Sequence, residues 1–410
     1  MIGTGGWRAD AARDLMRNTG ERAALFVRGE GAHLWDADGR RYLDFLAGIA
    51  VDSLGHAHPA FVAAVTTQAA TLTHVSNYFA TPPQLALAAR LKRLAGTGSS
   101  GRVFFGNSGA EANEAAFKLA RLHGGAERPR ILALRGAFHG RTMGTLALTG
   151  KPAMREPFEP MVPGVEFIDS TLDALADALD DRVAALFVEP IQGEAGVVEL
   201  PEGYLPGARD LTRRHGSLLI VDEVQTGAGR TGEWFAFQHD GIEPDAITVA
   251  KGIGGGFPIG ALITFGTAGD LFSPGTHGST FGGNALATAV ADAVLTEIER
   301  ADLVSAAADR GDQVRAAVAG IGSPLVGGVR GRGLLLGVAL TRPVAVDLAA
   351  AALERGLVVN AANDSTIRLA PPLIIGDAEM DEFAELFATA LRAVEVAEPA
   401  AAARAAGRPA

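Results

Sequence analysis

The middle of the chain alternates short apolar runs with helix-like stretches, and this alternation limits the fold more than any other feature. The runs are rich in Val, Ile, Leu and Phe and occur at residues 102–105, 130–134, 184–189, 217–222, 246–250 and 261–265. Helical patterns lie between several of them, as at residues 111–122 and 204–215. Apolar strands separated by helices are typical of a parallel sheet that helices cover on both faces. We therefore predict an α/β fold with a large domain built on a central, mostly parallel sheet.

The two ends of the chain have a different pattern, which predicts a smaller α+β domain. Residues 33–46 resemble a hairpin with Asp38-Gly39 as its turn. After the middle region come an Ala-rich helical stretch and two strand-like segments, and then a final helix near residues 379–394. The predicted boundaries are an N-terminal part of the small domain at 1–55, a large domain at 56–299, the rest of the small domain at 300–396 and a disordered tail at 397–410.

Composition excludes several functions. The chain has 410 residues, a formal charge of −11 and no cysteine. This charge argues against a nucleic-acid partner, which needs a basic face. The lack of cysteine excludes disulfides, thiolate metal sites and cysteine nucleophiles. The sequence shows neither a run long enough to span a membrane nor a basic, apolar leader, so we expect a cytoplasmic protein without a membrane partner.

Lysine is rare in this chain, so a candidate for lysine chemistry is easy to find. Lys92 and Lys118 lie in amphipathic helical patterns and are expected to be solvated, and Lys151 lies in a loop with no strand to position it. Lys251 differs, because it ends the apolar run AITVA and precedes the glycine-rich segment GIGGGFPIG. Such a turn allows a flat ring to approach the amine without obstruction.

A carboxylate ends the neighbouring apolar run, because SLLIVD finishes at Asp222. Ligands of open parallel sheets bind at the carboxyl ends of the strands, so Asp222 and Lys251 should share one rim. A lysine can form a Schiff base with pyridoxal phosphate, while a carboxylate keeps the ring nitrogen protonated. The alternative interpretations are a helix-capping aspartate and a surface lysine.

A third segment, RVFFGNSGAEANEAAFKLARL, predicts a strand, a loop of small residues and a helix. The N–H groups at the start of a helix can bind a phosphate, so Ser108, Gly109 and Ala110 are candidate phosphate donors. Ser108 and Glu111 also fit a capping box. This segment alone supports phosphate binding and helix capping equally.

Other patterns do not indicate a site. No Walker-type loop occurs, and the glycines near residue 331 do not have the spacing of a dinucleotide-binding loop. His56 and His58 lack acidic or cysteine companions at metal spacing, so we expect a turn there and no metal site.

Between about residues 18 and 394 the chain resembles the class-III aminotransferases, which are fold-type-I enzymes dependent on pyridoxal phosphate. The matching segments are GHAHP (55–59), GNSGAEANEAAFKLAR (106–121), AFHGRT (137–142), VEPIQGEAGV (188–197), VDEVQTGAGRTG (221–232), AKGIGGGFPIGA (250–261), HGSTFGGN (277–284) and IRLAPPL (367–373). Each segment alone is weak evidence for this family, but together the segments are specific for it.

The resemblance implies further cofactor contacts and a homodimer. Phe138 is expected to stack on the pyridine ring, and Gln225 to contact the phenolic oxygen. Thr280 is expected to reach the phosphate of the partner subunit's cofactor, which implies composite active sites.

The resemblance also implies how small-molecule substrates bind. Arg141 is expected to bind a substrate carboxylate and Arg368 a second one, with Ser279 also in the substrate site. Glu194 is expected to pair with Arg368 when the substrate lacks a second carboxylate. A fixed structural salt bridge between these two residues is the alternative.

Among class-III aminotransferases the chain is most similar to those that transfer the δ-amino group of N2-acetylornithine to 2-oxoglutarate, which gives glutamate. Ornithine aminotransferases typically have tyrosines where this chain has Thr19 and Ile49, and this difference fits a donor with an acylated α-amine. The expected role is arginine biosynthesis. The alternatives are succinylornithine, succinyldiaminopimelate, ornithine or GABA as donor, and an aminomutase on the same fold.

Overall fold

The computed structural model describes residues 6–406 and gives side chains through residue 396. Residues 1–5 and 407–410 lie outside the described part of the chain, and this includes the end of the tail predicted at 397–410. The last helix, α13 (Asp377–Ala406), continues beyond residue 396. Among the described residues, no helix combines the length and apolar character that crossing a membrane requires.

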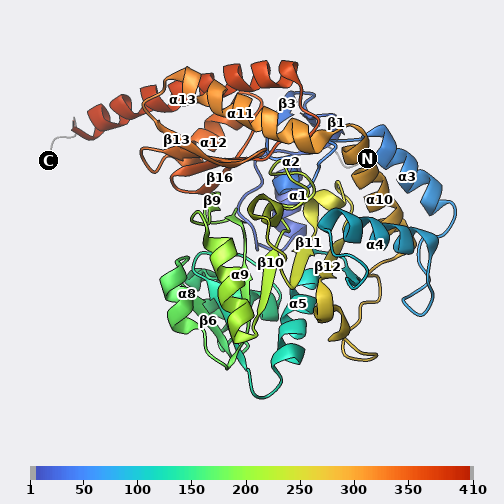
Figure 1. Cartoon of the computed structure of the whole chain (residues 1–410). Helices are drawn as coiled ribbons and strands as arrows, with labels where there is room; N and C mark the ends of the chain where they lie inside the picture. The colour runs from blue at the N-terminus through green and yellow to red at the C-terminus, as the bar shows by residue number, and fades with distance from the viewer. Residues whose placement is uncertain (1–5, 407–410) are drawn as a thin grey trace.

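A seven-stranded sheet forms the centre of the lower body in Figure 1. Its order is β4 (Val103–Gly106), β12 (Gly260–Thr264), β11 (Ala246–Val249), β10 (Leu218–Asp222), β7 (Val183–Val188), β5 (Arg130–Leu134) and β6 (Val165–Ile168). The pairs β11–β10, β10–β7, β7–β5 and β5–β6 are parallel, so the mostly parallel sheet is confirmed. Six of the strands match predicted runs, and β6 was not predicted.

One strand of this sheet runs against the others. β12 pairs antiparallel with both β11 and β4. Only residues 250–259 connect β11 to β12, and a parallel crossover needs a dozen or more residues. The short connection therefore returns the chain in the opposite direction and leaves its glycine-rich turn at the end of β11.

Helices cover both faces of the large sheet. The alternation of side chains along β10 shows this: Leu219 and Val221 pack into the core that includes α9 (Tyr204–His215), while Ile220 packs with α5 (Gly109–Gly124). The remaining helices of the region are α3 (Pro59–Ala69), α4 (Pro82–Ala95), α6 (Met143–Leu148), α7 (Pro152–Arg155), α8 (Leu172–Ala178) and α10 (Ala285–Arg300).

The upper layer of Figure 1 combines segments from the N-terminal and C-terminal parts of the chain. One sheet has the order β1 (Phe26–Glu30), β2 (His33–Asp36), β3 (Arg41–Asp44) and β15 (Leu357–Val358). A second sheet has the order β13 (Val326–Arg332), β14 (Leu335–Leu340), β17 (Thr366–Leu369) and β16 (Asn360–Asn363). Helices α11 (Leu303–Ile321), α12 (Ala345–Glu354) and α13 accompany them.

Aromatic packing links the two chain ends. The rings of Phe45, just after β3, and Phe383, in α13, are stacked with centroids 4.2 Å apart. The predicted hairpin is present, because β2 and β3 pair antiparallel around Asp38-Gly39. On these grounds we propose that 1–55 and 300–396 form one domain and 56–299 the other.

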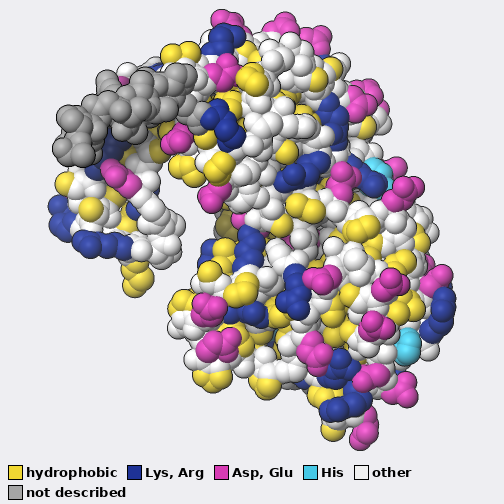
Figure 2. Space-filling model, turned by 90° about the vertical axis from the view of Figure 1, so that its left-hand side faces the viewer, with side chains coloured by type: hydrophobic (Ala, Val, Ile, Leu, Met, Phe, Trp, Pro, Cys, Tyr) yellow, Lys and Arg dark blue, Asp and Glu magenta, His cyan; other side chains and the backbone are white. Residues whose placement is uncertain are grey.

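Short elements lie at the junction between the two layers: α2 (Ala47–Ala50), β8 (Ile191–Gln192) and β9 (Val198–Glu199). Ala50, Ile191 and Val197 share a buried cluster with Leu335 there. The helix α1 (Trp7–Asp14) has no buried residue. Figure 2 shows that one face of the molecule is deeply hollowed and that Lys and Arg side chains lie at the edge of the hollow.

Candidate functional site

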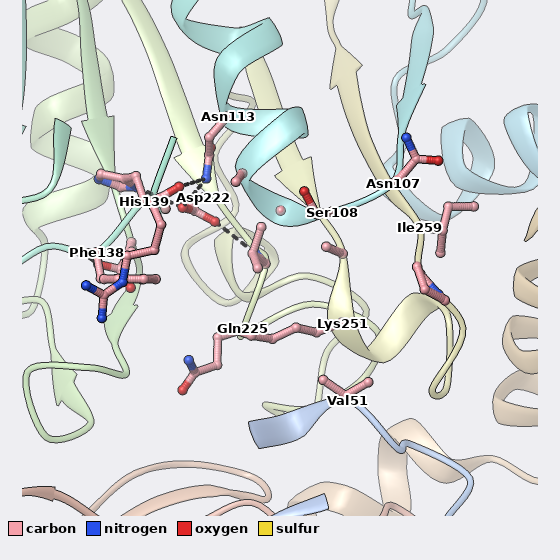
Figure 3. Close-up of a pocket in the computed structure, with 18 of the residues that line it drawn as sticks. Val51, Asn107, Ser108, Asn113, Phe138, His139, Asp222, Gln225, Lys251 and Ile259 are labelled. Carbon is pink, nitrogen blue, oxygen red and sulfur yellow. Dashed lines mark hydrogen bonds and ion pairs between the residues drawn. The ribbon is translucent and has the colours of Figure 1, made fainter. Parts of the chain in front are cut away.

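A cavity of about 430 Å³ lies at the carboxyl ends of β10 and β11. Both strand-end residues, Asp222 and Lys251, line it, and so does the start of α5 (Figure 3). Its volume is in the range of small-molecule sites. Its other lining residues include Val51, Asn107, Asn113, Phe138, His139, Arg141, Glu189, Val224, Gln225, Phe257 and Ile259.

Lys251 begins the short 3₁₀ turn η3 (Lys251–Ile253) directly after β11. Its φ is +45°, a left-handed conformation that is rare for a residue with a side chain. Burial lowers the pKa of Lys251, and the carboxylates of Asp222 and Glu194 oppose this shift. A lysine with a lowered pKa is more often in the neutral form that acts as a nucleophile.

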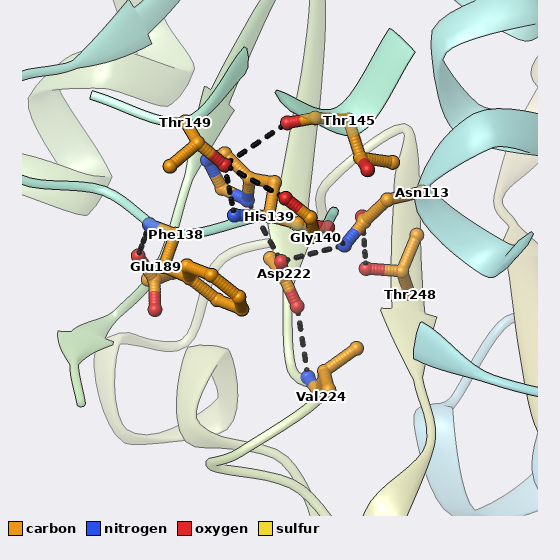
Figure 4. Close-up of polar contacts among 10 residues, drawn as sticks. All are labelled: Asn113, Phe138, His139, Gly140, Thr145, Thr149, Glu189, Asp222, Val224 and Thr248. Carbon is orange, nitrogen blue, oxygen red and sulfur yellow. Dashed lines mark hydrogen bonds and ion pairs between the residues drawn. The ribbon is translucent and has the colours of Figure 1, made fainter. Parts of the chain in front are cut away.

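Asp222 is buried and accepts three hydrogen bonds (Figure 4). Its Oδ2 accepts from Asn113 Nδ2 at 2.8 Å and from His139 Nδ1 at 2.7 Å. Its Oδ1 accepts from the backbone N–H of Val224 at 3.0 Å. Three donors on one carboxylate fix its orientation toward the cavity. The carboxylate can therefore hold a proton on a nitrogen of a bound ring.

The start of α5 forms another wall of the cavity. Ser108 Oγ accepts from Glu111 N at 3.1 Å, so Ser108 is the N-cap, while Ser108, Gly109 and Ala110 all line the cavity. The first N–H groups of a helix have no acceptor within the helix, so those of Gly109 and Ala110 can bind an anion. A side chain at Gly260 would lie 2.2 Å from the Ser108 carbonyl oxygen, which explains glycine there.

The loop after β5 contributes an aromatic ring and a cation. Phe138 is half-buried, and the Arg141 guanidinium carbon lies 5.6 Å from the centroid of its ring. Glu189, at the end of β7, accepts a hydrogen bond from the Phe138 N–H at 2.8 Å. Burial raises the pKa of Glu189, and the neighbouring His139 opposes this. Arg141 is exposed at the mouth of the site and can reach an anionic ligand there.

Arg368 lies outside the cavity lining and contacts it through Gln225. Its Nη1 donates to Glu194 Oε1 at 2.5 Å and to Gln225 Oε1 at 3.2 Å, while its Nη2 donates to Asn360 Oδ1 at 2.8 Å. Lys151 Nζ donates to the Glu194 carbonyl oxygen at 2.6 Å, and burial lowers the pKa of Lys151. Arg368 is therefore a second cationic group near Lys251, in addition to Arg141.

Comparisons with known proteins identify the family of this chain. The family model for "Aminotransferase class-III" matches residues 16–391. The chain belongs to the class-III aminotransferase family. The acetylornithine aminotransferase of Mycobacterium tuberculosis is 55% identical over 90% of this chain and 92% of the relative. The acetylornithine aminotransferase of Streptomyces coelicolor is 52% identical over 90% of this chain and 91% of the relative.

Solved structures agree with this family membership. The ornithine aminotransferase of Toxoplasma gondii has a TM-score of 0.91 at 34% identity and covers 96% of both chains. The N-acetylornithine aminotransferase of Stenotrophomonas maltophilia has a TM-score of 0.81 at 36% identity, covering 92% of this chain and 97% of that one.

As a class-III aminotransferase, the chain is an enzyme that uses pyridoxal phosphate. The cavity fits this cofactor by its chemistry. It has a buried amine for the aldehyde, an ionised carboxylate for the ring nitrogen and the free N–H groups at the start of α5 for the phosphate.

Four predicted site residues of this aminotransferase are not among those that line the cavity: Glu194, Ser279, Thr280 and Arg368. Ser279 Oγ accepts from Asn107 Nδ2 at 3.3 Å, so it contacts a lining residue. Thr280 is exposed on the same loop, next to Phe281, whose side chain is also exposed. Within one subunit, the structure therefore leaves Thr280 without a contact to the cavity.

Sequence reasoning missed several residues around the site of this aminotransferase. Asn113, His139, Thr248 and Glu189 are all buried close to Asp222 or Phe138. Asn113 had a detectable signal, because an amide within the apolar face of AEANEAAF needs a buried partner. Lys151 was interpreted as lacking a strand to position it, but the backbone of residue 194 holds its amine.

Proposed function

We propose that this enzyme transfers the δ-amino group of N2-acetyl-L-ornithine to 2-oxoglutarate, giving N-acetyl-L-glutamate 5-semialdehyde and L-glutamate. The observation that carries the proposal is the high identity, over nine-tenths of the chain, to relatives named acetylornithine aminotransferase. Two separate arginines near the buried lysine support it, because 2-oxoglutarate has two carboxylates. The proposal includes arginine biosynthesis as the role and the cytoplasm as the location.

In this proposal Lys251 holds the cofactor and Asp222 binds its ring nitrogen. Ser108, Gly109 and Ala110 bind the phosphate, Phe138 stacks on the ring and Gln225 contacts the phenolic oxygen. When bound, pyridoxal phosphate accepts the amino group and withdraws the electrons released at the reacting carbon. The lowered pKa of Lys251, which burial causes, supports a role for its amine as the base that takes the proton from the donor's δ-carbon.

The second part of the proposal concerns the two cationic groups. Arg141 binds the α-carboxylate of the donor and one carboxylate of 2-oxoglutarate, while Arg368 binds the other. Glu194 neutralises Arg368 while the donor is bound, because that substrate has no carboxylate to place there. Ser279 completes the substrate site. The ion pair between Glu194 and Arg368, held beside the cavity by Gln225, supports this assignment.

A homodimer is the third part of the proposal. Thr280 contacts the phosphate of the cofactor in the partner subunit, so each active site contains residues of both chains. The exposure of Thr280, together with exposed aromatic side chains at Tyr78, Phe79 and Phe281, supports a contact surface on this side of the enzyme.

Ornithine is the second candidate donor, because the ornithine aminotransferase of Toxoplasma gondii has the same fold at a TM-score of 0.91. Absorbance changes of the bound cofactor with N2-acetylornithine, ornithine and GABA separate these donors. We expect the fastest change with N2-acetylornithine, and a clear preference for either other donor would overturn the substrate assignment.

Replacement of Lys251 tests the site itself. Lys251→Ala should abolish the cofactor absorbance that depends on a covalent bond to the enzyme, while Lys92→Ala, on the surface of α4, should leave it unchanged. An unchanged spectrum in Lys251→Ala would mean that another amine holds the cofactor.

A further inference from the structure

The side chain of Asn113 has only one orientation that its neighbours allow. Its Nδ2 lies 2.8 Å from Asp222 Oδ2 and 2.9 Å from the His139 carbonyl oxygen. Both of these neighbours can only accept when Asp222 is ionised, so the amide nitrogen must face them. The amide oxygen then faces Thr248, whose Oγ1 lies 2.8 Å away and must donate (Figure 4).

Thr248 therefore acts on Asp222 through Asn113. A chain of hydrogen bonds runs from the Thr248 hydroxyl to the amide and from the amide to the carboxylate. All three side chains are buried, with exposed fractions of 0% for Thr248, 1% for Asn113 and 4% for Asp222. In such surroundings each unmade hydrogen bond is costly, and linked bonds strengthen one another.

This chain of hydrogen bonds joins the three elements that build the site. Asn113 lies one turn into α5, the helix whose start lines the cavity. Thr248 lies on β11, three residues before Lys251, and pairs in register with Asp222 on β10. A shift of any one element relative to the others would break a bond in the chain.

We propose that Asn113 and Thr248 are positioning residues that fix the Asp222 carboxylate against the cofactor ring nitrogen. This inference rests on the proposed role of Asp222. The ionised carboxylate keeps the ring nitrogen protonated, and that positive charge lowers the proton affinity of the Lys251 nitrogen across the ring. The titratable groups that face Asp222 are His139, Glu189, Glu223 and Lys251.

Two substitutions at position 248 distinguish the effect of the Thr248 hydroxyl from the effect of its methyl packing. Thr248→Val keeps the shape and suits a buried strand, but it removes the donor to Asn113. Thr248→Ser keeps the donor and removes one methyl group. If the hydroxyl matters, Ser should resemble the parent and Val should not. If packing alone matters, Ser should be the more damaging change, because it leaves a small cavity.

The measurements are the pH titration of the cofactor's visible absorbance in the holoenzyme and the binding of pyridoxal phosphate to the cofactor-free protein. For Thr248→Val and Asn113→Ala we expect the midpoint of the titration to rise by about half a pH unit or more. We expect cofactor binding to weaken about tenfold, as on loss of one hydrogen bond to a charged group. Thr248→Ser should change neither quantity appreciably.

Two outcomes would overturn the inference. The first is a parental midpoint in both Thr248→Val and Asn113→Ala, and the second is a Thr248→Ser enzyme that titrates like Thr248→Val. If Thr248→Val does not fold, the titration of Asn113→Ala alone decides. Lys251→Ala distinguishes a failure of this inference from a failure of the proposed function. If Lys251→Ala loses the covalently bound cofactor but Thr248→Val and Asn113→Ala titrate as the parent does, then only the positioning role is wrong.

Discussion

Glu194 and Arg368 form an ion pair whose two side chains differ in accessibility: 2% of the arginine side chain is exposed, compared with 27% of the glutamate side chain. Arg368 is also held by Asn360 and Gln225, so it has little freedom to move. Among the residues that the structure describes, Arg368 is the one side chain hydrogen-bonded to the Glu194 carboxylate. The glutamate is therefore the partner that can leave when a substrate carboxylate arrives.

Glu194→Ala should affect the two half-reactions differently. Without Glu194, the Arg368 charge is not neutralised while a donor with a single carboxylate is bound, and an unpaired buried charge is unfavourable. We expect kcat/KM for N2-acetylornithine to fall about tenfold, as for loss of a charge-assisted hydrogen bond, while KM for 2-oxoglutarate stays equal or falls. Single-turnover kinetics with each substrate measure this split.

The matched control is Glu199→Ala, which removes a different glutamate–arginine pair, with Arg332, on nearby β9. It should leave the ratio of the two half-reactions unchanged. Equal losses in both half-reactions of Glu194→Ala would indicate a purely structural salt bridge.

Two substitutions at Ser108 should separate helix capping from phosphate binding. Ser108→Ala removes the acceptor for Glu111 N and should cost about 1 kcal/mol of stability in the cofactor-free protein. Ser108→Asp keeps an acceptor at the N-cap, so the cofactor-free protein should remain close to parental stability. Its added negative charge should nevertheless weaken cofactor binding by about tenfold or more, because it repels the phosphate. Denaturant unfolding and cofactor titration measure the two effects, and parental cofactor affinity in Ser108→Asp would place the phosphate elsewhere.

Asp52, which follows the cavity-lining Val51, should make stability depend on pH. Burial raises the pKa of Asp52 to about 6, with a further contribution from Asp44, while His56 and Arg230 oppose it. Because this pKa exceeds the ordinary aspartate value of 3.8, the folded state binds more protons than the unfolded state between pH 3.8 and about 6. The contribution of Asp52 to stability therefore falls as pH rises from about 4 to 6 and stays low above that range.

Asp52→Asn removes this titration. Relative to the parent, its Tm should rise across that pH window and then remain higher up to pH 8. Thermal unfolding of the cofactor-free protein at several pH values tests this. A Tm difference that does not vary with pH would show that Asp52 titrates normally.

Phe383→Ala should strongly destabilise the layer that contains both chain ends. Phe383 is fully buried and stacks on Phe45 and Phe387. Removal of a buried phenylalanine ring typically costs about 3–5 kcal/mol. Phe158→Ala is the control, because Phe158 is exposed and its loss should change stability by no more than about 0.5 kcal/mol. Denaturant unfolding compares the variants, and equal losses would show that the Phe383 ring contributes nothing by its packing.

Local patterns predicted those parts of the fold that are buried on both sides. Strands β10 and β11 are buried at every position and mostly apolar, so their ends at Asp222 and near Lys251 could be located from sequence. β6 is partly exposed and contains the exposed Glu166, so it lacks the apolar run that revealed the others. The antiparallel direction of β12 was not predicted, although only residues 250–259 separate it from β11, too few for a parallel crossover.

Residues at strand ends could be predicted from the sequence, whereas residues paired across distant segments could not. Asp222 and Lys251 follow from strand ends, because neighbouring parallel strands share a rim. Glu194 and Arg368 are 174 positions apart, and no local spacing connects them, so only the resemblance to a family suggested the pair. Asn113 was missed because its partners come from three other segments: the loop after β5, the end of β10 and the strand β11.

The pairing of β3 with β15 joins Leu43 to Leu357 across most of the chain. During synthesis the first three strands leave the ribosome long before their fourth neighbour exists. At about 5–20 residues per second, the delay is roughly 15–60 s. Throughout that interval the apolar side chains of Leu43 and Phe45 lack the covering that the C-terminal segment supplies. The nascent enzyme therefore carries an open strand edge until translation is almost complete, and this is the stage at which a chaperone would protect it from aggregation.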